Sequence, residues 1–381
     1  MTPDELIAIG NQHRDQNNPE QALACYAHVF AQDRKNVHAF NNYGNVLREV
    51  GDAEGAIPFL QRAILLDPTN STAQFNLAVA YLLTGDLDRG WKQYEHRWNF
   101  EHLNGTLPNF DKPRWAGEDL KDKTILVVGE QGHGDNIQFS RFALNLIQLG
   151  AKIILQVNDN IGALFKNSEN LRIIDVTDTP DGFDYWTPIM SIPGILNINY
   201  NNLDQVHRYI VADAKLYREW LTLLGPKKKL RVGFCWSGRR DSWINRHKAM
   251  PQSVMLDLIR RNPNYDWFNL QLDATPEETE ALRSVGVVEY PATLKNFADT
   301  AALMSTLDVV ISVDTAVAHL GGAMGVPTWI MLNNYALDWR WLLDRDSSPW
   351  YSTARLFRQP AMGDWQSVTD KVHQYLSWFK V

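Results

Sequence analysis

Apolar residues in the first hundred positions follow helical spacing and recur with a period of 34 residues. Equivalent places in three copies hold small or large apolar residues: Ala22, Ala56 and Gly90; Gly10, Gly44 and Ala78; Tyr26, Leu60 and Tyr94. The middle copy, AFNNYGNVLREVGDAEGAIPFLQRAILLDP, is complete, with a turn at Gly51-Asp52 and a closing Pro68. Since one helix pair buries a face on the next, we predict three stacked helix pairs over residues 1–100.

After a connector at 101–122, the pattern changes to short apolar runs that alternate with helical stretches. In the half that covers 123–226, strands are predicted at 124–129, 152–157 and 172–176. Helices are predicted at 136–150 and over FKNSENL (165–171). Parallel strands joined by crossover helices are typical of a doubly wound sheet.

A second half of the same kind covers 227–365 and follows the linker GPKKK. Its predicted strands are 230–236, 266–272, 309–313 and 327–332, and a closing helix is expected in 366–381. The predicted fold class is therefore α-helical repeats followed by an α/β part with two Rossmann-like doubly wound domains. Such sheets bind ligands beyond the carboxyl ends of their strands, so we expect a cleft between them.

The composition excludes several classes of protein. Of 381 residues, 45% are hydrophobic and 21% are charged, which is typical of a folded globular chain. The net charge is −7, and basic residues cluster only at Lys227–Lys229, which argues against nucleic-acid binding. Cys25 and Cys235 have no metal or disulfide spacing. No apolar run approaches the roughly 20 residues of a membrane span, and we expect a cytoplasmic protein.

The stretch GEQGHGDNIQF places Gly132, His133, Gly134, Asp135 and Asn136 at a predicted strand-to-helix turn. The glycines permit unusual torsions and close approach of a ligand. A helix that starts near Asn136 would stabilise the carboxylate of Asp135 at its N-terminus, where it could accept a proton. The alternative is that Asp135 only caps the helix. His133 has no assigned role.

A second stretch, VISVDTAVAHLGGAMGVP, places Asp314 and Thr315 where a strand meets a helix. Free backbone N–H groups at this junction could bind an anion. His319 lies one helical turn beyond Thr315, although a single histidine is more often structural. Gly321 and Gly322 weaken a helix, which indicates close packing or a ligand against it.

The third stretch, SGRRDSWINRHKAMP, is rich in cations: Arg239, Arg240, Arg246, His247 and Lys248. A cationic loop beside a helix start is suited to a diphosphate, because it neutralises charge on the bound and on the leaving group. The alternative is a solvated loop without a ligand.

These stretches, with SIPGIL, DWRWLLDRDSSPWY and RLFRQP, resemble bacterial tetratricopeptide-repeat proteins with a glycosyltransferase-family-9-like, or heptosyltransferase-like, C-terminal part. The α/β resemblance begins at about Trp115, and the helical period resembles the tetratricopeptide repeat. The resemblance implies a GT-B fold and metal-independent, inverting transfer of a sugar. The donor would be a nucleotide sugar, and no separate cofactor is expected.

The same resemblance assigns roles to individual residues. Asp135 would be the base that deprotonates the acceptor. Asp314, Thr315 and His319 match the family's donor-binding motif, although Ala316 stands where the family has glycine. Lys248 is the best match for the cation on the donor phosphate, with Arg246 second. Gln271 would lie near the nucleotide base and Asp299 near the cleft.

Several alternatives remain at this stage. The repeats would recognise a protein or peptide acceptor or partner, or they would only serve packing or self-association. A non-catalytic scaffold with a degenerate transferase part is the main rival to an enzyme. An oxidoreductase with Asp159 on the ribose is disfavoured, because Asn136 and Ile137 occupy the place of the third fingerprint glycine. An epimerase that acts on nucleotide sugars is equally disfavoured.

Overall fold

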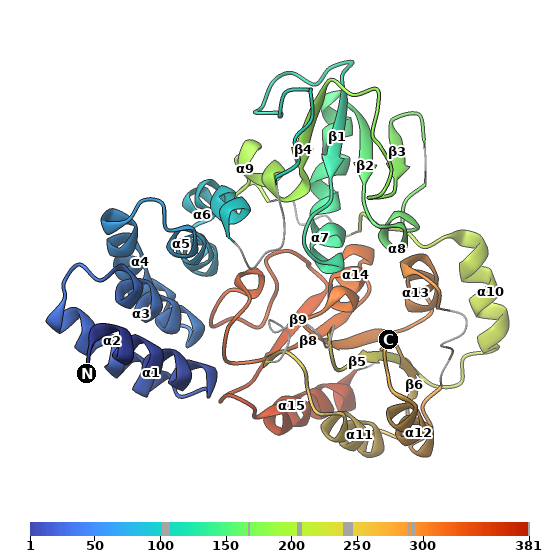
Figure 1. Cartoon of the computed structure of the whole chain (residues 1–381). Helices are drawn as coiled ribbons and strands as arrows, with labels where there is room; N and C mark the ends of the chain where they lie inside the picture. The colour runs from blue at the N-terminus through green and yellow to red at the C-terminus, as the bar shows by residue number, and fades with distance from the viewer. Residues whose placement is uncertain are drawn as a thin grey trace. The chain divides into compact units, whose positions relative to one another are not determined.

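The computed structural model describes residues 1–100, 107–166, 168–203, 208–238, 247–288, 290 and 294–379. The chain divides into two compact units. The first, here the helical unit, comprises Met1–Pro108, Asn197–Leu203 and Asn334–Arg345. The second, the α/β unit, comprises Asn109–Leu196, Asp204–Asn333 and Asp346–Val381. Helical repeats followed by two parallel α/β sheets confirm the predicted fold class (Figure 1).

The helical unit is built from paired helices, drawn in blue in Figure 1. Their bounds are α1 Pro3–Asp15, α2 Pro19–Gln32, α3 Val37–Glu49, α4 Ala53–Leu66, α5 Ser71–Leu83 and α6 Leu87–Tyr94. A 3-10 helix, Glu95–Asn99, follows α6. Small residues let the paired helices touch: a Cβ on Gly44 would lie 2.8 Å from Cγ of Leu60.

The helix starts keep the 34-residue period. An oxygen of a capping side chain accepts the N–H three residues later in α1, α3, α4, α5 and α6; the capping residues are Thr2, Asn36, Asp52, Asn70 and Asp86. Such caps bind N–H groups that have no partner inside the helix. The sequence therefore sets the helix boundaries through local hydrogen bonds.

The turn inside each helix pair also repeats. Asn17, Gly51 and Gly85 have φ values of 61°, 92° and 86°. Glycine adopts this left-handed conformation without strain, and asparagine is the side chain that tolerates it best. The first copy, although weaker in sequence, thus forms the same turn as the other two.

The first sheet of the α/β unit is parallel, in the order β3-β2-β1-β4. Its strands are β1 Thr124–Val128, β2 Lys152–Gln156, β3 Leu171–Ile174 and β4 Tyr185–Pro188. Strand β4 was not predicted, because YWTP is short and ends in proline; as an edge strand it tolerates Pro188. The helix predicted over 165–171 is wrong: Ser168 instead pairs with Leu171 in a turn, and α8 spans Asp159–Gly162.

The second sheet is parallel as well, in the order β6-β5-β7-β8-β9. Its strands are β5 Arg231–Cys235, β6 Asp266–Asn269, β7 Val309–Val313, β8 Thr328–Leu332 and β9 Ala354–Arg358. Strands β5, β7 and β8 are mostly apolar and are buried along their whole length, including the one polar residue in each: Arg231, Ser312 and Thr328. Strand β9 joins the edge of the sheet beside β8.

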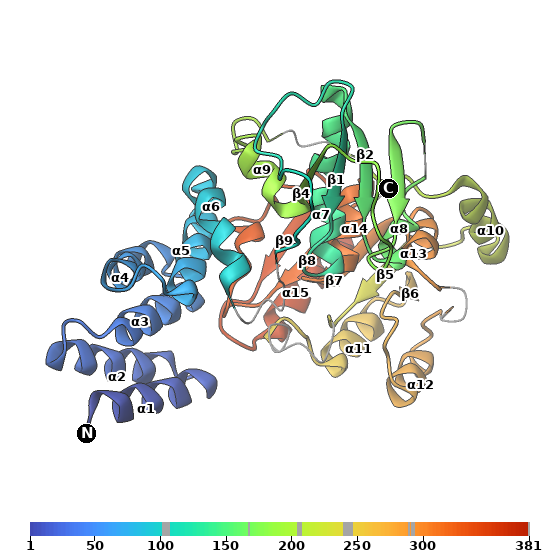
Figure 2. The ribbon, with the colours of Figure 1, turned by 45° about the horizontal axis from the view of Figure 1, so that its top comes forward.

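Helices cover both faces of the second sheet (Figures 1 and 2). On one face, α11 (Gln252–Arg261) and α15 (Trp365–Trp378) bury Met255, Leu258, Val368 and Val372 in a hydrophobic core cluster. On the other face lie α13 (Phe297–Met304) and α14 (Ala316–Met324). Helix α14 packs against α7 (His133–Asn145), which follows the first sheet's central strand β1.

The closing helix, α15, is close to its predicted position. Further α-helices of the described residues are α9 (Ile192–Ile195), α10 (Ala214–Leu224) and α12 (Pro276–Ser284).

Candidate functional site

The first part of the site is the start of α7. Helix α7 begins at His133, three residues before the predicted start, because Oδ2 of Asp135 accepts the N–H of Gly132 at 2.8 Å and closes the first turn. Asp135 therefore lies within the first helical turn rather than before it. The carboxylate is half-buried and has the favourable end of the helix dipole next to it.

The glycines of this turn were expected to permit unusual torsions or close approach. The expectation of unusual torsions is wrong, and close approach accounts for Gly134. Gly132 has φ −89°, and the left-handed residue of the turn is Gln131, with φ 59°. A Cβ on Gly134 would lie 2.7 Å from Cδ2 of His319 and 3.5 Å from Cα of Ala316. Gly134 thus lets the start of α7 approach the start of α14.

Asn136 braces the turn with its side-chain amide. Its Oδ1 accepts the N–H of Glu130 at 3.1 Å, and its Nδ2 donates to the carbonyls of Glu130 (3.2 Å) and Gly132 (3.0 Å). His133 is exposed, and its ring lies edge-on to Phe297 at the start of α13, with the centroids 5.3 Å apart. Three helix starts, those of α7, α13 and α14, therefore lie close together.

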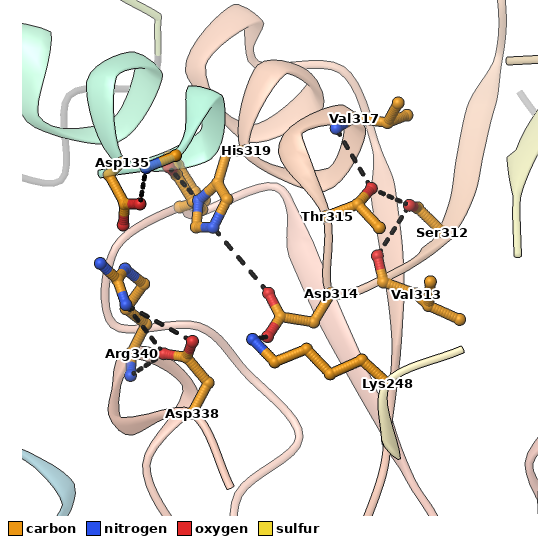
Figure 3. Close-up of polar contacts among 12 residues, drawn as sticks. Asp135, Lys248, Ser312, Val313, Asp314, Thr315, Val317, His319, Asp338 and Arg340 are labelled. Atoms are coloured by element: carbon orange, nitrogen blue, oxygen red, sulfur yellow. Dashed lines mark hydrogen bonds and ion pairs between the residues drawn. The ribbon is translucent and has the colours of Figure 1, made fainter. Parts of the chain in front are cut away.

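Asp314 directly follows β7 and forms a buried ion pair (Figure 3). Its Oδ2 lies 2.5 Å from Nζ of Lys248, and the two side chains are only 4% and 10% exposed. Its Oδ1 lies 3.9 Å from Nε2 of His319, which exceeds hydrogen-bonding distance. Residues distant in sequence thus meet at the carboxyl end of one strand.

Thr315 caps α14, and Ala316 is the first residue of that helix. Oγ1 of Thr315 accepts the N–H of Val317 at 3.3 Å and lies 3.2 Å from Oγ of Ser312. Ala316 has no positive φ, so alanine at the place of the family's glycine fits the turn without strain.

Gln271 lies beside this junction and joins two strand ends. Its Oε1 accepts the N–H of Ser237 at 2.9 Å and lies 3.1 Å from Sγ of Cys235. The same sulfur lies 3.9 Å from Oγ1 of Thr315. Burial raises the pKa of Cys235 to about 11, so this residue is a neutral thiol near neutral pH.

The last two predicted site residues are Asp299 and Arg246. Oδ2 of Asp299 accepts the N–H of Lys295 at 2.9 Å, next to the capping residue Asn296, so the carboxylate stabilises the start of α13. Arg246 lies outside the described residues, as do Arg239 and Arg240.

Two residues that sequence reasoning missed complete the cluster. Tyr351 places its hydroxyl 2.9 Å from Nδ1 of His319. Arg141 on α7 lies over the ring of Tyr351, with its guanidinium carbon 5.0 Å from the centroid, and donates to the carbonyl of Trp350 at 2.9 Å. The only sequence signal for Tyr351 was its place in SSPWY, within the family resemblance.

The helix glycines have packing partners. A Cβ on Gly322 would overlap the ring of Tyr351, and one on Gly321 would overlap Oγ1 of Thr328. Close packing, one of the two expectations for this pair, therefore accounts for both glycines.

Across the described part of the chain, no three His, Cys, Asp or Glu side chains gather as a metal ion would require. Metal-independent chemistry remains a prediction. Among the same residues, no helix is both long and apolar enough to cross a membrane.

Comparisons with known proteins agree with the helical assignment. Residues 47–90, from the end of α3 into α6, match the family model for the tetratricopeptide repeat. Protein FlbA of Caulobacter vibrioides is 24% identical in an alignment that covers 97% of this chain and 72% of that protein.

Two solved structures are similar to the remaining part of the chain. A glycosyl transferase of family 9 from Veillonella parvula is 13% identical, covers 69% of this chain and 99% of its own, and has a TM-score of 0.48. The E. coli heptosyltransferase WaaC with ADP is also 13% identical, in an alignment that covers 67% of this chain and 99% of that protein, and has a TM-score of 0.45. These identities are too low for a substrate to be carried from one protein to another.

Proposed function

We propose that the α/β unit transfers a sugar from a nucleotide-activated donor to an acceptor hydroxyl, with inversion and without a metal. One observation carries the proposal: the start of α7, with Asp135, lies against the start of α14, with Asp314 and His319, through the contact between Gly134 and His319. A proton acceptor and a group of anion-binding elements are thereby brought together. Sugar transfer requires both.

The donor side would be formed at α14. Backbone N–H groups at the start of a helix favour a phosphate, and Thr315 positions this start by capping it. Lys248 supplies the cation, and Asp314 would accept hydrogen bonds from sugar hydroxyls. In this arrangement Lys248 neutralises charge that develops on the leaving diphosphate.

The acceptor side would be formed at α7. The carboxylate of Asp135 takes the proton of the acceptor hydroxyl while that oxygen bonds to the anomeric carbon. The bond from this carbon to the diphosphate breaks on the opposite face, which inverts the configuration. A carboxylate offers about four lone-pair sites, and the hydrogen bond from the N–H of Gly132 occupies one of them, so capping and base catalysis are compatible.

Two variants test the base assignment. Asp135→Asn should reduce transfer at least a hundredfold and leave the affinity for the nucleotide diphosphate unchanged, because only proton acceptance is lost. Glu278→Gln is the matched control, because Glu278 closes the same kind of capping box at the start of α12. Transfer rates and calorimetric affinities would be measured for both. Retained transfer by Asp135→Asn would refute the base role.

A non-catalytic role is the second candidate, because the capping bond to Gly132 by itself accounts for Asp135. A thermal-shift panel of ADP, UDP, GDP and nucleotide sugars separates the two. Stabilisation by a nucleotide diphosphate supports the transferase. Stabilisation by none of them supports a scaffold.

A further inference from the structure

His319 is held between two oxygen atoms in the α/β unit. On one side, Nδ1 lies 2.9 Å from the hydroxyl of Tyr351, and on the other, Nε2 lies 3.9 Å from Oδ1 of Asp314. His319 is 5% exposed and Tyr351 is 1% exposed. A neutral imidazole carries one proton, on either Nδ1 or Nε2, and its neighbours decide which nitrogen holds it.

Asp314 favours the proton on Nε2. Its carboxylate is charged, because Oδ2 is paired with Nζ of Lys248 at 2.5 Å. An N–H that points towards an anionic oxygen is attracted to it, whereas a nitrogen lone pair in the same place is repelled. Since both side chains are buried, water screens this difference only weakly.

Tyr351 favours the same tautomer. With the proton on Nε2, Nδ1 is an acceptor and the hydroxyl of Tyr351 must donate to it. The guanidinium carbon of Arg141 lies 5.0 Å from the ring centroid of Tyr351, and a cation over a phenol ring withdraws electron density and strengthens the O–H as a donor. Arg141 is itself fixed by the carbonyl of Trp350 and by the ring of Tyr209, 4.7 Å from its guanidinium carbon.

The packing around the two rings leaves little room for either to turn. Gly134 lies against Cδ2 of His319, and Gly322 lies against the ring of Tyr351. A Cβ at position 134 or 322 would overlap the ring that packs there. The hydrogen bond between Tyr351 and His319 is therefore held by backbone on both sides.

We propose that Tyr351 is a positioning residue that holds His319 as the Nε2–H tautomer, with this N–H directed towards Asp314. Its consequence for catalysis rests on the proposed function, because Asp314 is there a donor-binding residue. The 3.9 Å separation of Nε2 and Oδ1 is too long for a direct bond and suits a ligand hydroxyl that accepts from His319 and donates to Asp314.

The tautomer can be measured without any substrate. In ¹⁵N-labelled full-length protein, long-range ¹H–¹⁵N spectra distinguish a protonated nitrogen from an unprotonated one, and His319→Gln identifies the relevant signals. The wild type should show the proton on Nε2 when the ring is neutral. A proton on Nδ1 would overturn the proposal, and this result needs no variant of Tyr351.

Tyr351→Phe removes only the hydroxyl and keeps the ring against Gly322. The fraction of His319 that carries the proton on Nε2 should then fall without vanishing, because Asp314 alone still favours this nitrogen. An unchanged fraction would overturn the proposal. Tyr209→Phe is the matched control, because it removes the hydroxyl of the other ring beside Arg141 and should leave the tautomer unchanged.

Affinity for a nucleotide diphosphate sugar gives a second readout. Tyr351→Phe should weaken this affinity about tenfold, which is the effect of one misdirected hydrogen bond. The thermal unfolding midpoint of the unliganded Tyr351→Phe protein should stay close to that of Tyr209→Phe. Equal affinities of the wild type and Tyr351→Phe would refute the role in donor binding. If the wild type binds no nucleotide, the proposed function fails, whereas the tautomer measurement still stands.

Discussion

Lys248 and Asp314 are almost completely buried, and the charge of each offsets the desolvation cost of burying the other. Taking a charge out of water costs several kcal/mol unless an opposite charge compensates for it. These two residues of the candidate site therefore also contribute to the stability of the α/β unit. A variant at either residue will alter folding as well as ligand binding, and the two effects have to be separated.

A double-mutant cycle separates them. Lys248→Met should lower the free energy of unfolding by about 3–5 kcal/mol, because the buried carboxylate of Asp314 loses the cation that lies 2.5 Å from it. Lys248→Met combined with Asp314→Asn should recover most of this loss, since no charge remains. Nucleotide affinity should be low in both variants. Denaturant unfolding and calorimetry test this, and a double variant no more stable than the single one would contradict it.

At the scale of single elements, the end of α3 joins several parts of the helical unit. Glu49, its last residue, accepts from Nε and Nη2 of Arg14 on α1 at 2.9 and 2.6 Å. The hydroxyl of Tyr335 donates to Glu49 Oε2 at 3.0 Å, and the N–H of Ala336 donates to its carbonyl at 2.8 Å. Glu49 thus joins two repeats to the segment Asn334–Arg345.

The charge of Glu49 makes this junction sensitive to acid. Burial by itself would raise the pKa of Glu49, but the hydrogen bond and charge of Arg14, with the charge of Arg48, lower it below the ordinary value. A lowered pKa stabilises the fold above the unfolded-state value of about 4.3. This stability is lost as the pH falls through the folded-state pKa, which lies lower.

Glu49→Gln should therefore lower the free energy of unfolding by about 3 kcal/mol at pH 7, because Arg14 and Arg48 lose their counter-charge. The difference from the wild type should shrink below about pH 4, where the wild type also becomes protonated. Chemical unfolding at several pH values measures both. Glu54→Gln, at an exposed position on α4, is the control and should have little effect. A difference that is independent of pH would contradict the argument.

At the scale of the whole molecule, the repeats are not a separate module. Trp91 on α6 donates to the carbonyl of Ile198 at 2.8 Å, and its ring lies edge-on to Trp339, with the centroids 5.5 Å apart. Two segments from the later part of the chain thus complete the helical unit. Part of the repeat surface is occupied by the chain's own residues, and an external partner for the remaining surface is still a prediction.

The segment Asn334–Arg345 is also strained. Ala336, Leu342 and Asp344 have φ values of 51°, 54° and 45°, each a left-handed conformation that costs about 1–3 kcal/mol in a residue with a side chain. Such strain persists only where the surroundings hold it. Packing of Trp339 against Trp91 and Tyr94 provides this restraint within the helical unit.

Cleavage of the chain tests this dependence. If a protease site is inserted after Pro108 and cut, the pieces 1–108 and 109–381 should elute together in size-exclusion chromatography, because residues 197–203 and 334–345 remain packed on the repeats. Trp339→Ala should weaken this association at least tenfold. Pieces that separate at micromolar concentration without that substitution would show that the segments contribute little.

What the sequence by itself determined is local. The 34-residue period, the helix caps, the turns at Asn17, Gly51 and Gly85, and the buried strands β5, β7 and β8 follow from propensities and hydrogen bonds between near neighbours in the chain. Asp135, Asp314 and His319 could be selected because each lies at a predicted strand end or helix start.

Only the tertiary structure decided the rest, because it depends on contacts between distant residues. The edge strand β4 carries too weak an apolar signal to be found without the neighbouring strand β1. The hydrogen bond of Tyr351 to His319 joins residues 32 positions apart, and the bond of Tyr335 to Glu49 joins residues 286 apart. No local propensity encodes such pairs; they exist because burial removes water, so each polar group must be satisfied by a group of the folded protein.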